Sequence, residues 1–125
     1  MASLAWRTRS SILDGPSLAR LRAALGDDQG LHDILDEFLV SSDAILRQMT
    51  DGLQHREARQ VERAAHTLKS MAGLIGATTL ADACRTVESQ AHGHSHAAPA
   101  LDPSLLERVA EHARDAQEAV ERLLH

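Results

Sequence analysis

Apolar residues recur at alternating steps of three and four along most of this 125-residue chain, and this spacing limits its fold most strongly. An α-helix has about 3.6 residues per turn, so such steps place apolar side chains on one side of a helix. The segment 29–50 shows the pattern clearly, beginning with Leu31, Ile34, Leu35 and Phe38. The sequence therefore predicts amphipathic helices that pack on one another.

The same spacing predicts one short helix followed by four longer ones. The short helix carries Leu18, Leu21 and Leu25 and ends at Gly26, a residue type common just past a helix. The longer helices span about 29–50, 55–75 and 79–91, and the last one begins at Pro103. Aromatic residues, which strands favour, make up only 2% of the chain. We therefore expect an all-α fold, an antiparallel up-down-up-down four-helix bundle with the short helix covering one end.

The chain is long enough for one domain and has no internal repeat. Residues 1–13 are predicted to be a loose N-terminal lead-in, and residues 14–125 to form the bundle domain. Residues 92–101 combine Gly, Pro and small polar residues without periodicity, so they are predicted to be a linker.

Composition excludes several classes of partner. The formal net charge is −5 and no run of Lys and Arg is present, so neither nucleic acid nor an anionic membrane is an expected partner. No apolar stretch approaches the roughly 18 residues that a bilayer span needs. The N-terminus lacks the apolar core of a signal peptide, and the single cysteine, Cys84, cannot form an internal disulfide. These features favour a cytoplasmic location.

One histidine of the predicted helix 55–75 has unusual neighbours. His66 lies on the polar side of that helix, and the chain's only lysine, Lys69, follows three residues later. Ser70 and Gly73, one and two turns on, are small and leave space beside the imidazole. A neutral imidazole is a good nucleophile near pH 7, and an ammonium can bind phosphoryl oxygens. The residues thus indicate half of a phosphoryl-transfer site, to be completed by a partner.

Residues 65–77 read AHTLKSMAGLIGA and resemble the signature of histidine-containing phosphotransfer (Hpt) domains. The matching positions are His66, Lys69 and Gly76, the last ten residues after the histidine. The resemblance covers about residues 14–124 and includes a following helix with Cys84 and Glu88. Ser70 departs from the glycine usual in the family; its hydroxyl could bond to the imidazole or to a phosphoryl group.

The resemblance implies a phosphorelay intermediate. His66 would accept a phosphoryl group from the aspartate of one receiver domain and pass it to another receiver domain. Lys69 would assist phosphoryl binding, while Ser70, Gly73 and Gly76 would shape the site. The expected docking residues beside it are Arg59, Glu62, Arg63 and Leu74.

The resemblance also implies that the chain binds no cofactor or metal, since Mg²⁺ would belong to the partner receiver domain. It contains no ATP-binding motif, so it is expected to be no enzyme of the kinase type. A free cytoplasmic protein and a domain of a hybrid sensor histidine kinase, tethered to the membrane through that kinase, both remain open.

Two other functions are compatible with the residues alone. His92, His94 and His96 alternate in the predicted linker and could form a metal-binding module, because imidazoles are common ligands of Zn²⁺, Cu²⁺ and Ni²⁺. The bundle could also be an interaction module without chemistry. The exposed His66 among small neighbours, with Lys69 beside it, argues against this second alternative.

Overall fold

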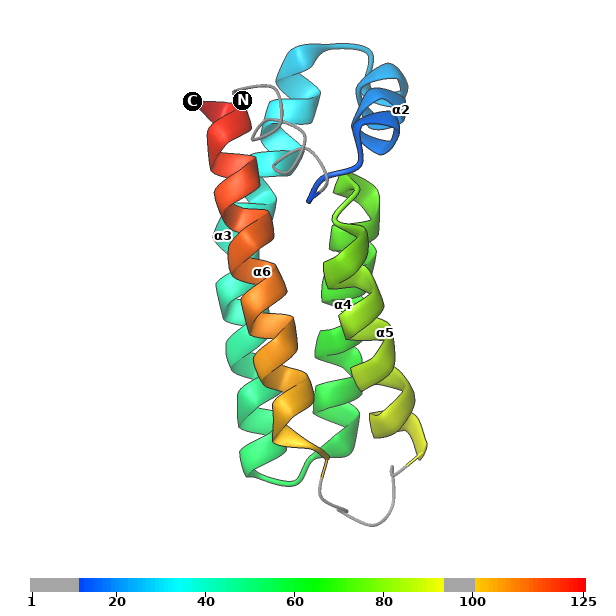
Figure 1. The fold of residues 1–125 in the computed structure, drawn as a ribbon, viewed down its shortest axis with the longest axis vertical. Coiled ribbons are helices and arrows are strands. Elements are labelled where there is room, and N and C mark those ends of the chain that lie inside the picture. The colour runs from blue at the N-terminus through cyan, green and yellow to red at the C-terminus, as the bar shows by residue number, and fades with distance from the viewer. Residues whose placement is uncertain (1–11, 94–100) are drawn as a thin grey trace, which may run out of the picture.

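The computed structural model describes residues 12–93 and 101–125, which form five α-helices and no strand. Figure 1 shows their course. The helices are α2 (Gly15–Leu25), α3 (Asp28–Gln54), α4 (Ala58–Ile75), α5 (Thr78–Gly93) and α6 (Pro103–Leu124). Within these described ranges, no helix combines the length and the apolar character needed to cross a membrane.

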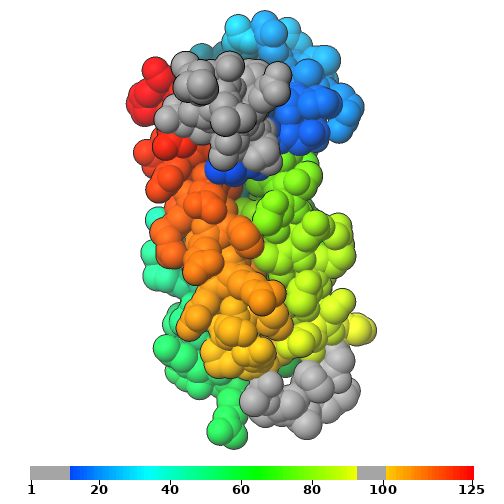
Figure 2. Space-filling view, in the orientation of Figure 1, coloured from blue at the N-terminus to red at the C-terminus, as the bar shows by residue number. Residues whose placement is uncertain are grey.

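Helices α3 to α6 run alternately up and down the long axis of the molecule and form a four-helix bundle (Figure 1). Each packs on the next in chain order, α6 closes against α3, and the α4–α5 pair is packed most closely. Helix α2 contacts α3 and α4 at one end (Figure 1). Figure 2 shows an elongated body with α5 and α6 neighbouring on the viewed face. The predicted all-α bundle with a short additional helix is confirmed.

The core consists mainly of Leu, Ile, Val and Ala side chains, with Phe38 and Met49 of α3 as its largest fully buried members. Helix α4 contributes fully buried Ala65, Leu68 and Ala72 at steps of three and four. Alanines at the contact allow neighbouring helices to approach closely, which fits the tight packing of α4 on its neighbours. This packing holds α4 as a rigid support for its outer face.

The helix ends differ from the predicted ones at three places, one of them the end of α3, which continues to Gln54 instead of stopping at about residue 50. Helix α5 continues through Gly93, so His92 belongs to a helix and not to the predicted linker, because Ala91 extends its buried face by another turn. His94 and His96 lie outside the described residues. Helix α4 begins at Ala58 instead of about residue 55, because the chain first turns through Arg56, whose φ is 56°.

Gly76 joins the end of α4 to the start of the described chain. Its φ of 81° lies in the left-handed region, and it terminates α4. The Asp14 amide donates to the Gly76 carbonyl over 2.8 Å, and Leu13 beside it is buried in the core. A Cβ at Gly76 would lie 2.9 Å from backbone atoms of Asp14. Glycine is therefore required here both by conformation and by space.

Replacing Gly76 by alanine should lower the free energy of unfolding by about 1–3 kcal/mol, since strain and close backbone contact act together. The matched control is Gly73→Ala, because a Cβ at Gly73 meets nothing within 4 Å and the residue is helical. That variant should gain roughly 0.5–1 kcal/mol. Urea unfolding of both variants measures the difference. Equal stability of the two would contradict this account of Gly76.

Candidate functional site

His66 projects outward from the middle of α4. Its side chain is 61% exposed, whereas Ala65 and Leu68 on the opposite face are fully buried. The apolar steps of α4 fix this orientation, because burying one face of a helix turns the other toward solvent. The structure thus confirms that the imidazole points away from the core.

Glu88 of α5 binds both predicted reactive side chains. His66 Nδ1 lies 2.7 Å from Oε2 of Glu88, and Lys69 Nζ donates to its Oε1 over 2.5 Å. His66 and Lys69 are one turn apart on α4, and Glu88 reaches both from the neighbouring helix. The His66–Lys69 pair predicted from spacing is therefore assembled by a third residue, to which the sequence assigned no role.

The carboxylate of Glu88 determines which ring nitrogen of a neutral His66 is free. An ionised carboxylate only accepts hydrogen bonds, so His66 donates the Nδ1 proton to it. The lone pair of a neutral imidazole then resides on Nε2, the ring nitrogen that Glu88 does not hold. The hydrogen bond from Lys69, followed by that from His66, lowers the pKa of Glu88, although partial burial opposes this shift. Glu88 is thus ionised at neutral pH.

The small residues beside His66 differ in what they do. A side chain at Gly73 would meet open space, so the glycine leaves no protruding side chain two turns beyond His66. Ser70 donates its hydroxyl to the main-chain carbonyl of His66 over 3.1 Å, and not to the imidazole. Gly76 lies ten residues from His66, about 15 Å along the helix axis, and acts as the helix end described above.

The residues predicted to dock a partner divide into two groups. Arg59, Arg63 and Leu74 are exposed on α4, Leu74 to 49%. At about 100° per residue, they share the flank of His66 that turns away from α5. Glu62 lies on the other flank, is partly buried, and accepts a hydrogen bond of 2.7 Å from Nδ1 of His92 on α5.

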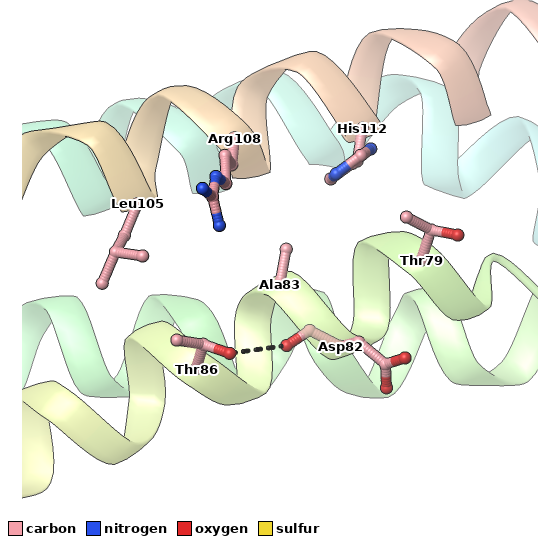
Figure 3. Close-up of a pocket in the computed structure, with 7 residues that line it drawn as sticks. All are labelled: Thr79, Asp82, Ala83, Thr86, Leu105, Arg108 and His112. Atoms are coloured by element: carbon pink, nitrogen blue, oxygen red, sulfur yellow. Dashed lines mark hydrogen bonds between the residues drawn. The ribbon is translucent and has the colours of Figure 1, made fainter.

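Over residues 12–93 and 101–125, no group of three or more His, Cys, Asp or Glu side chains is placed to hold a metal ion. Pockets open elsewhere: a surface pocket of about 240 Å³ lies between α5 and α6 (Figure 3). Its polar lining includes Thr79, Arg108 and His112, and none of the predicted site residues. His66 therefore lies on an open helix surface and not in this pocket, and such a surface is suited to binding a macromolecular partner.

Comparison with known proteins identifies the class. The sequence matches the family model of the Hpt domain over residues 33–125, so the chain belongs to the Hpt family. It is thus a phosphotransfer domain of phosphorelays and not a kinase. Among solved structures, it is similar to histidine-containing phosphotransfer protein B (HptB) from Pseudomonas aeruginosa PAO1. The identity is 25% and the TM-score 0.78, over 90% of this chain and 94% of the other. The curated proteins give no significant match.

Glu88 should make the stability of the protein depend on acidic pH. Its pKa is lower in the folded than in the unfolded chain, so its contribution is fully present above the unfolded value, about 4.3. That contribution is lost as the pH falls through the lowered pKa of the folded state. The urea midpoint of unfolding should therefore fall more between pH 7 and pH 3 in the wild type than in Glu88→Gln. An equal drop in both proteins would contradict the interaction.

Proposed function

We propose that His66 is the phosphoacceptor of this Hpt domain. The observation that carries this proposal is the exposed imidazole whose Nδ1 is held by Glu88, which leaves Nε2 as the nucleophile. The partners are receiver domains, which donate the group from an aspartyl phosphate and accept it on another aspartate. The chain acts on the cytoplasmic side, either alone or as part of a hybrid sensor kinase.

Transfer follows from the arrangement of atoms. The Nε2 lone pair of His66 attacks the phosphorus of the aspartyl phosphate; an N–P bond forms, the O–P bond breaks, and the aspartate leaves as a carboxylate. The ring then carries a positive charge, which the carboxylate of Glu88 at Nδ1 stabilises. The reverse sequence delivers the group to the second receiver. Mg²⁺ belongs to the receiver in this scheme, where it offsets phosphoryl charge.

Lys69 contributes a cation at a defined position. Its side chain is 26% exposed, and Glu88 holds its ammonium beside the imidazole. A phosphoryl group on Nε2 adds negative charge within reach of this ammonium, so Lys69 favours the transferred state. Glu88 thereby acts as a positioning residue for both groups.

The surface around His66 supports approach by a receiver. Gly73 and Ser70 keep the helix surface low, so that phosphorus can come within the roughly 3–3.5 Å that attack on it requires. Leu74 offers an exposed apolar contact on the same helix, and Arg59 and Arg63 offer positive charge toward acidic receiver edges.

The direct test uses an isolated receiver carrying a labelled aspartyl phosphate. Wild type and the control His32→Gln, an exposed histidine on α3, should both acquire acid-labile label. His66→Gln should acquire none, because the amide is not a nucleophile of comparable strength. Transfer of label to His66→Gln at the wild-type rate would refute the assignment of His66 as the phosphoacceptor.

Lys69→Ala should slow transfer by about 10-fold or more, because a cation near the transferring group is lost. Since Lys69 is partly exposed, the variant should still unfold cooperatively in urea. Single-turnover rates from the same phosphorylated receiver give the measurement. A wild-type rate in Lys69→Ala would exclude the proposed role of the ammonium.

A further inference from the structure

A second histidine–carboxylate pair lies beside the first, with the helices exchanged. In the first pair, His66 of α4 bonds to Glu88 of α5; in the second, His92 of α5 bonds to Glu62 of α4. Both bonds join Nδ1 to a carboxylate oxygen over 2.7 Å. Glu62 precedes His66 by four residues on α4, and His92 follows Glu88 by four residues on α5. Because α4 and α5 are antiparallel, both steps lead in the same direction along the bundle.

The two imidazoles therefore present equivalent atoms on one surface. The His92 side chain is 79% exposed, and Glu62 fixes its ring through Nδ1 as Glu88 fixes that of His66. The second pair is displaced from the first by one helical turn, about 5.4 Å along the bundle. Nε2 of His92 thus belongs to the same face as the proposed nucleophile.

A protein that brings an aspartyl phosphate to His66 must cover this position. Stable protein interfaces bury about 800 Å² on each partner, a patch with a radius of about 16 Å. The His66–Glu88 pair lies at the centre of that patch, and His92 lies one helical turn away. The surface of the phosphorylated partner therefore reaches His92. Unlike Glu88, Glu62 bonds to no lysine among the described residues, so His92 lacks the cation that accompanies His66.

We propose that His92 is a specificity-determining contact for the receiver, with Nε2 hydrogen-bonded to a polar group beside the receiver's phosphorylated aspartate and with Glu62 as its positioning residue. The inference rests on the proposed function of His66. A receiver that lacks the complementary polar group would leave Nε2 buried without a partner and would bind less tightly. His92 thus selects among receivers without taking part in the chemistry.

The test is the KM and kcat of transfer from a phosphorylated receiver to His92→Asn, Glu62→Gln and the matched control His32→Asn. The asparagine amide can still donate to Glu62, as Nδ1 does, but has no atom at the position of Nε2. His92→Asn should raise KM about 3- to 30-fold with kcat within about 2-fold, and the control should match the wild type.

Glu62→Gln should raise KM by a smaller factor, and adding it to His92→Asn should change KM little further, because it acts through the same ring. A KM equal to the wild-type value in His92→Asn would overturn the inference, as would a loss confined to kcat. Both results require a wild type that accepts the phosphoryl group. A wild type that accepts none would instead defeat the proposed function itself, so the two failures are distinguishable.

Discussion

The carboxylate of Glu88 is the contact on which the site depends. It comes from α5, while the two groups that it holds, His66 and Lys69, come from α4. Without it, the exposed imidazole would exchange its proton between two nitrogens and turn freely, and the ammonium would be an unattached surface cation. The close antiparallel packing of α4 and α5 is therefore part of the chemistry as well as of the fold.

The packing that supports this contact follows from the steps of three and four residues in α4. Buried Ala65, Leu68 and Ala72 fix the rotation of the helix, and that rotation brings His66 to the exposed side and Lys69 toward α5. Gly76 ends the helix with a φ of 81° and receives the backbone of Asp14, which anchors the start of the described chain. Gly73, unlike Gly76, is not required by backbone conformation or by a close backbone contact. Its lack of a side chain keeps the surface beside the imidazole open.

The sequence predicted the bundle because periodicity and end signals are local properties. The terminator Gly26 lies where the residues indicated. The outward position of His66 followed from the same periodicity. The roles of Glu88 and Glu62 could not be predicted in this way, since each depends on the register between two helices, and the bonds join residues 22 and 30 positions apart. His92 was assigned to a linker because Gly and Pro follow it, whereas its helix gains one more turn of burial through Ala91.

The tautomer of His66 shows whether Glu88 orients the nucleophile. A long-range ¹H–¹⁵N correlation spectrum, recorded at a pH where the ring is neutral, distinguishes a proton on Nδ1 from one on Nε2. We predict that the wild-type ring carries its proton on Nδ1 and that Glu88→Ala loses this preference. A neutral His66 protonated mainly on Nε2 in the wild type would show that Glu88 does not orient the nucleophile.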